Sequence, residues 1–155
     1  MNHVQQDIEP VVNEAMTKLE TALLTPLVSG ELESWVQDVR AAGVELGPAL
    51  REFLETVLHA QYVQIAKTDE ELLSRVEQMI EEDKNLLGEY DGFLVEVETL
   101  AARVPSVEKD ELKVTDRRAH LETRGNALIL RIRKQRAVAS TWLSEAFYRD
   151  RGPVD

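Results

Sequence analysis

Residues 71–103 read ELLSRVEQMIEEDKNLLGEYDGFLVEVETLAAR, and this stretch decides the fold. A row of residues spaced three or four apart runs through it, and all but one of them are apolar: Val76, Ile80, Asp83, Leu87, Tyr90, Leu94, Val97 and Ala101. Such spacing places the row on one face of an α-helix. The stretch therefore predicts a long amphipathic helix, with Asp83 in the face that packs against the rest of the protein.

Three more segments have the same periodicity, over residues 4–24, 31–66 and 107–148. Pro26 and Pro105 are expected to end the first and third helices, because the residue before a proline disfavours the α conformation. Thr68 and Glu71 have the spacing of a capping box, which would begin the third helix. Ser106 is expected to cap the last helix.

The second segment contains an interruption at Gly43, Gly47 and Pro48. Proline removes a backbone donor and clashes with the preceding turn, so we expect the second helix to be kinked or broken near Gly43–Pro48. The apolar row then resumes at Leu50, Leu54, Val57, Gln61 and Ile65.

Length and composition favour one helical domain that spans residues 1–155. The chain is 43% hydrophobic, 30% charged and only 5% aromatic, which is typical of amphipathic helices and not of a β-sandwich. Short connections between long helices make consecutive helices antiparallel neighbours. The predicted fold is an all-α, up-down antiparallel four-helix bundle.

The charge distribution and the absence of cysteine exclude several classes of function. The net charge is −11, and residues 106–155 carry 11 Lys and Arg against 8 Asp and Glu. A strongly acidic chain repels nucleic acid and anionic membranes. We interpret the basic run from Arg117 to Arg136 as neutralising the acidic helices of its own bundle or as a solvated face, with an anionic partner as the alternative. Without cysteine, disulfides and thiolate metal sites are excluded. Neither a secretory leader nor a membrane-length apolar run is seen, and a cytoplasmic location is the expectation.

Three polar residues occupy the predicted apolar rows: Gln61, Asp83 and Gln135. A buried polar group without a partner costs a few kcal/mol. Amide groups can donate to a carboxylate and limit that cost. We therefore interpret the three residues as a candidate buried polar layer with mutual hydrogen bonds. An exposed position for Asp83, near an end of the bundle, is the alternative.

No complete catalytic motif is present, and the sequence predicts neither an enzyme nor a cofactor. A bundle di-iron site needs His and carboxylates at spacings of three or four on inward faces. The only histidines are His3, His59 and His120, and no two of them are spaced for ligation. A metal site is therefore not expected, although a weak one centred on Asp83 is kept as an alternative.

Three stretches resemble bacterial hemerythrin-like proteins: LREFLETVLHAQ at 50–61, EEDKNLL at 81–87, and RKQRAVASTWLSEAFYRDRGPVD at 133–155. The resemblance implies a four-helix bundle in which inward His and Glu hold two irons that bind dioxygen or related small molecules. It places the ligand positions at Val57, Gln61, Asp83, Gln135 and Ala139. None of these is His, and only Asp83 is a strong ligand, because amides and alkyl groups do not replace imidazole for iron. The resemblance thus supports the fold and argues against the activity.

The sequence leaves three functions open. The first is a non-enzymatic bundle that acts by protein contact or by binding a small ligand, with an unidentified protein partner or a second copy of the chain. The second is a flagellar or secretion export chaperone with an apolar groove, since residues 124–130 (RGNALIL) are similar to a stretch in the last helix of such chaperones. The third is the weak metal site around Asp83.

Overall fold

The computed structural model describes residues 2–26, 28 and 30–150, and side chains between residues 8 and 148 within that range. No strand occurs in this part of the chain, so the expected all-α class is confirmed. The helical elements are α1 Asn2–Leu24, α2 Leu32–Glu52, η1 Phe53–Leu58, α3 His59–Thr68, η2 Glu70–Leu72, α4 Leu73–Val107 and α5 Glu111–Asp150. Because α2, η1 and α3 follow one another without a gap, they form one long helical stretch.

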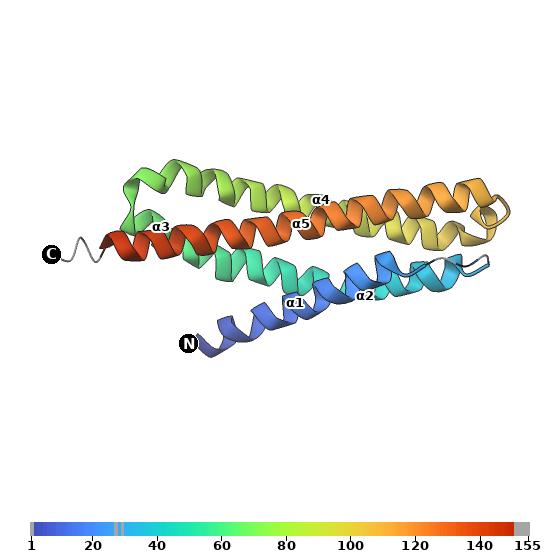
Figure 1. Cartoon of the computed structure of the whole chain (residues 1–155), viewed down its shortest axis with the longest axis horizontal. Helices are drawn as coiled ribbons and strands as arrows, with labels where there is room; N and C mark the ends of the chain where they lie inside the picture. The colour runs from blue at the N-terminus through green and yellow to red at the C-terminus, as the bar shows by residue number, and fades with distance from the viewer. Residues whose placement is uncertain (1, 27, 29, 151–155) are drawn as a thin grey trace.

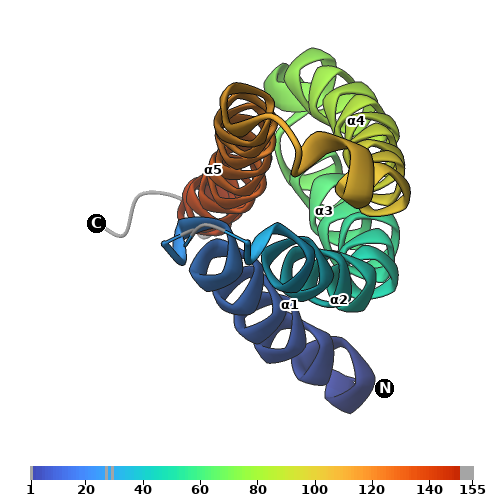
Figure 2. The same ribbon diagram turned by 90° about the vertical axis from the view of Figure 1, so that its right-hand side faces the viewer.

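The long stretches lie side by side as a bundle. In Figure 1, α1 runs toward the loop at Gly30, the α2–α3 stretch returns beside it, α4 runs out again and α5 returns. Figure 2 looks along the bundle and shows α5 between α4 and α1, with α2 on the opposite side. Each of these neighbours is in contact, so four apolar faces close on one core. Gly30 has φ +86°, a left-handed conformation that favours glycine, at the turn into α2.

The second helical stretch departs from the prediction. It is not broken at Gly43–Pro48, since α2 continues through both residues to Glu52. Pro48 cannot donate to the carbonyl of Val44, and both residues are exposed, so water can take the place of the missing donor. A bend at this position stays a prediction. The irregularity lies at η1 instead, which is a π-helix of six residues. A π turn has hydrogen bonds from residue i to i+5 and so accommodates one extra residue.

Both predicted helix caps are wrong by one to four residues. The side chain of Asp69, not Thr68, accepts a hydrogen bond from the Glu71 amide at the start of η2. At the last turn, α4 runs past Pro105 to Val107, and Asp110 accepts from the Leu112 amide in place of Ser106. In each case a carboxylate near the expected position provides the stronger acceptor for a helix N-terminus.

Small residues let the helices approach closely. Gly125 of α5 lies against Leu23 and Phe93, and a methyl group added at Gly125 would fall 2.5 Å from Leu23 Cδ1. Gly43 of α2 lies against Leu94, and its carbonyl accepts a 2.6 Å hydrogen bond from the hydroxyl of Tyr90. These contacts bring α1, α2, α4 and α5 together around one core. Within the described residues, no helix combines the length and the apolar character needed to cross a membrane.

Candidate functional site

Asp83 of α4 and Gln135 of α5 meet inside the bundle. Each residue is only 6% exposed, and Nε2 of Gln135 donates a 2.8 Å hydrogen bond to Oδ1 of Asp83. Both lie in the apolar rows that the sequence assigned to their helices. The structure therefore brings two of the three expected polar residues together and buries them.

Gln61, the third expected member, is not part of this buried pair, and this corrects the sequence interpretation. Gln61 is only partly buried, whereas its neighbour Tyr62 is fully buried. The π turn η1 lies just before α3 and changes the facing of the residues that follow it, so Tyr62 takes the inward position expected for Gln61, while Ile65 of the predicted row is buried as expected. The polar cluster is therefore Tyr62, Asp83 and Gln135, and we refer to these three residues as the polar cluster below.

Burial governs the electrostatics of the polar cluster. It raises the pKa of Asp83 to about 6, although the amide of Gln135 and the hydroxyl of Tyr62 both favour the charged carboxylate and Glu82 opposes it. Burial, followed by the charge of Asp83, also raises the pKa of Tyr62 above its usual range. Asp83 is thus a carboxylate that loses its charge more readily than an exposed one.

One side of the cluster is incompletely hydrogen-bonded. Oδ2 of Asp83 and the hydroxyl of Tyr62 are both buried without a partner at hydrogen-bonding distance, even though Tyr62 lies near enough to influence the carboxylate. An open cleft of about 190 Å³ reaches both residues between α3 and α4. Glu55, His59 and Lys84 also line this cleft, and all three are exposed.

The residues around Asp83 do not make a metal centre of the kind that the resemblance describes. Val57 and Ala139, two of the implied ligand positions, are apolar and buried. In the described part of the chain, no group of three or more His, Asp or Glu is arranged to hold a metal ion. The side chain of His3 lies outside that part, and His120 pairs with Glu96 at 3.1 Å. The imidazole of His59 lines the same cleft as Asp83, but it is exposed at the rim and does not take one of the implied ligand positions.

Several arginines of α5 form ion pairs with the acidic helices. Arg133 contacts Glu20 of α1 through two hydrogen bonds of 2.8 and 3.3 Å. Arg131 pairs with Glu89, and Arg124 pairs with Glu96, both on α4. The interpretation that the basic run neutralises its own bundle is confirmed for these arginines.

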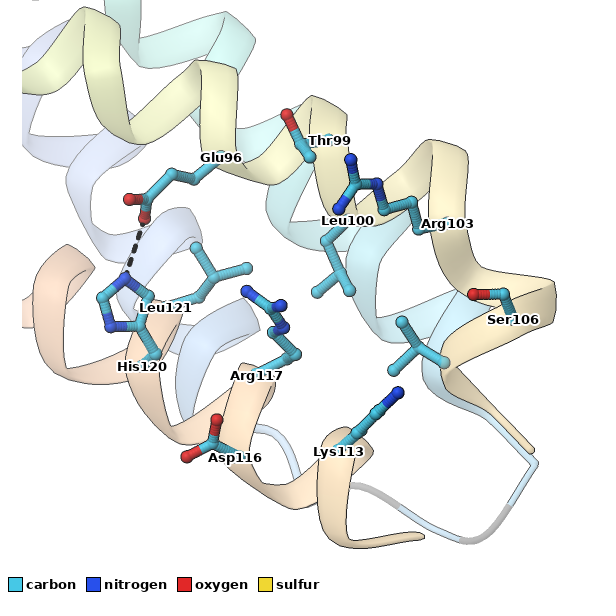
Figure 3. Close-up of a pocket in the computed structure, with 11 residues that line it drawn as sticks. Glu96, Thr99, Leu100, Arg103, Ser106, Lys113, Asp116, Arg117, His120 and Leu121 are labelled. Atoms are coloured by element: carbon cyan, nitrogen blue, oxygen red, sulfur yellow. Dashed lines mark hydrogen bonds and ion pairs between the residues drawn. The ribbon is translucent and has the colours of Figure 1, made fainter. Parts of the chain in front are cut away.

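A second hollow, of about 460 Å³, lies between α4 and α5 near the turn that joins them, as Figure 3 shows. Arg103, Lys113 and Arg117 surround it. Sequence reasoning missed this hollow and also missed Tyr62. Three cations within fifteen residues of Pro105 were visible in the sequence, but their convergence depends on the turn geometry. The inward position of Tyr62 depends on the π turn.

Comparison with known proteins found no match: no family model matches the chain, and no curated protein or solved structure is significantly similar to it. Functional inference therefore rests on the residues and their geometry.

Proposed function

We propose that this chain is a non-enzymatic helical-bundle protein that acts by binding, through a protein contact or a small ligand. In this proposal the bundle is up-down and antiparallel, and it is a hemerythrin-like protein that has lost its di-iron ligands. The observation that supports it best is the buried hydrogen bond between Asp83 and Gln135 at two of the implied ligand positions. In this proposal an amide stands in the place of a metal ligand and donates to one oxygen of the carboxylate, Oδ1.

Three features argue against a working metal site at the polar cluster. One oxygen of Asp83 already accepts from Gln135, and Val57 and Ala139 contribute only alkyl groups. The nearest imidazole, His59, is exposed on the rim of the cleft. A di-iron centre of this architecture needs several inward His and carboxylate ligands. The chemistry available to Asp83 is proton uptake and hydrogen bonding.

A structural role explains why a polar pair is kept in an apolar row. A buried hydrogen bond between two helices is satisfied in one register only, and sliding α4 along α5 would leave both groups unpaired. We propose that the Asp83–Gln135 pair fixes the register of α4 against α5.

The test is metal analysis combined with thermal melts. Protein purified without chelator is assayed for iron, manganese and zinc, and is then melted with and without each added divalent ion, beside Asp83→Asn. The proposal predicts metal far below one equivalent and the same Tm with and without the ion. Stoichiometric metal, or a rise in Tm that Asp83→Asn abolishes and the exposed control Asp116→Asn retains, would establish the metal-binding alternative.

The other expectations stay predictions. The export-chaperone alternative predicts saturable binding of an amphipathic helical peptide. A homodimer predicts a doubled mass in sedimentation or light scattering, and a cytoplasmic location predicts recovery from the soluble cytosolic fraction.

A further inference from the structure

The hollow between α4 and α5 differs in charge from the rest of this acidic protein. Figure 3 shows Arg103 on α4 and Lys113 and Arg117 on α5 around the same space. In the part of the chain that the structure describes, the side chain of none of the three forms an ion pair or a hydrogen bond; Lys113 donates only its backbone amide, to Asp110. Three unpaired cations thus converge in a chain whose net charge is −11.

The carboxylates near the hollow do not neutralise these cations. Glu96 is held by His120 at 3.1 Å and by Arg124 at 2.5 Å. Although burial opposes it, these partners hold the pKa of Glu96 below its usual range, so the carboxylate is charged and already paired. Asp116 is the one other acid that lines the hollow, and it forms no ion pair with Lys113 or Arg117 within 4.0 Å. The wall therefore carries an excess of unpaired positive charge.

The floor of the hollow is apolar. Leu100, Val107 and Leu121 line it and are 5%, 7% and 3% exposed, so their side chains belong to the core. A volume of about 460 Å³ lies in the range of small-molecule sites. A hollow of this kind matches a ligand with an apolar body and an anionic end.

We propose that this hollow is a binding site for a small amphiphilic anion, namely a carboxylate or phosphate headgroup on a short apolar body. Guanidinium groups present planar, paired donors that match the oxygens of such a headgroup, and the apolar body covers the three floor residues. This inference rests on the proposed function in one respect: it assumes that the protein acts by binding a ligand. The metal test at Asp83 and the binding test at this hollow use different sites and readouts, so either can fail alone.

The first experiment is calorimetric titration with octyl phosphate and octanoate, at low salt and at about 0.15 M salt. Octanol provides the apolar body without the charge, and inorganic phosphate provides the charge without the body. We expect one saturable site with Kd below about 1 mM for at least one amphiphile, and binding at least about tenfold weaker for both controls. Absence of saturable binding, or equal binding of octanol or of inorganic phosphate, would overturn the proposal.

Matched variants locate the site. Arg103→Gln and Arg117→Gln should each weaken binding by about three- to tenfold, because each removes a charged donor from a partly exposed site. Arg75→Gln on α4 and Lys134→Gln on α5 remove the same charge at exposed positions away from the hollow and should change Kd by less than about twofold. If the control variants weaken binding equally, the anion is attracted by the overall charge of the protein and not by this hollow, and the proposed site is wrong.

A variant that fills the hollow tests the need for its space separately from the need for its charges. Ser106→Trp leaves every cation in place and puts an indole at the exposed rim of the hollow. We expect it to abolish binding while the far-ultraviolet circular dichroism stays helical. If a folded Ser106→Trp protein binds the amphiphile as tightly as the wild type, the ligand does not lie on the apolar floor of the hollow, and the proposal is contradicted.

Discussion

Asp83 is a carboxylate enclosed by apolar side chains, with one firm donor in Gln135 and an unsatisfied second oxygen. Burial raises its pKa to about 6, so the folded protein holds this proton more tightly than the unfolded chain does. Ionising Asp83 therefore costs stability. The cost is absent below the unfolded pKa, near 4, and is complete above the folded pKa, near 6.

The first prediction is a specific pH dependence. Relative to Asp83→Asn, the wild-type free energy of unfolding should fall by about 2–3 kcal/mol as the pH rises from about 4 to 7. Urea denaturation of both proteins at several pH values in this window measures the difference, and other titrating groups cancel because the two chains share them. A difference that stays constant with pH would show that Asp83 is not desolvated.

At the scale of the helix, the π turn η1 decides which residue of α3 faces Asp83. The predicted row places Gln61 on the inward face, whereas Tyr62, one residue later, is the residue that is buried after the π turn. We predict that Tyr62→Ala destabilises the protein by about 3–5 kcal/mol, because it empties a fully buried aromatic site. Gln61→Ala should change the free energy of unfolding by no more than about 0.5 kcal/mol. Chemical denaturation of the two variants compares them directly. A larger loss of stability in Gln61→Ala than in Tyr62→Ala would show that Gln61 faces inward, as the predicted row has it.

Helix contact at Gly125 gives a third prediction. A methyl group at this position would lie 2.5 Å from Leu23 Cδ1 and 3.2 Å from Phe93 Cζ, in a closed part of the core. Gly125→Ala should therefore destabilise the bundle by about 1–3 kcal/mol. Gly88→Ala is the matched control, since nothing lies within 4 Å of the added atom, and it should stabilise α4 by about 0.5–1 kcal/mol. Thermal melts measure both effects. The same change in Tm for Gly125→Ala and Gly88→Ala would contradict the close contact between α1 and α5.

The sequence predicted the buried rows of α4 and α5 well because both helices keep the α-helical period over their whole length. Asp83 and Gln135 were found as polar members of these rows, and both are buried. The prediction failed at Gln61, although Leu54, Val57 and Ile65 of the same row are buried, because a π turn leaves no mark in the apolar pattern. It also ended α4 too early, because Pro105 fits inside the last turn of a helix that continues to Val107.

At the scale of the whole molecule, the long helices share one core and complementary charge. The basic helix α5 lies between α1 and α4, and its arginines reach acids on both (Figure 2). Most of these pairs are partly exposed, so each contributes little to stability and loses strength with salt. The Asp83–Gln135 contact is different, because it is buried and joins α4 to α5.

The most direct test of the account is a double-mutant cycle on this pair, measured as the free energy of unfolding at about pH 7.5. Gln135→Leu leaves a buried carboxylate without its donor and should cost about 2–4 kcal/mol. Asp83→Leu should cost less, because it removes the charge itself. The double variant Asp83→Leu/Gln135→Leu should recover most of the loss, with a coupling energy of at least about 1 kcal/mol. Additive effects with no coupling would contradict the claim that Asp83 and Gln135 act as one buried structural pair.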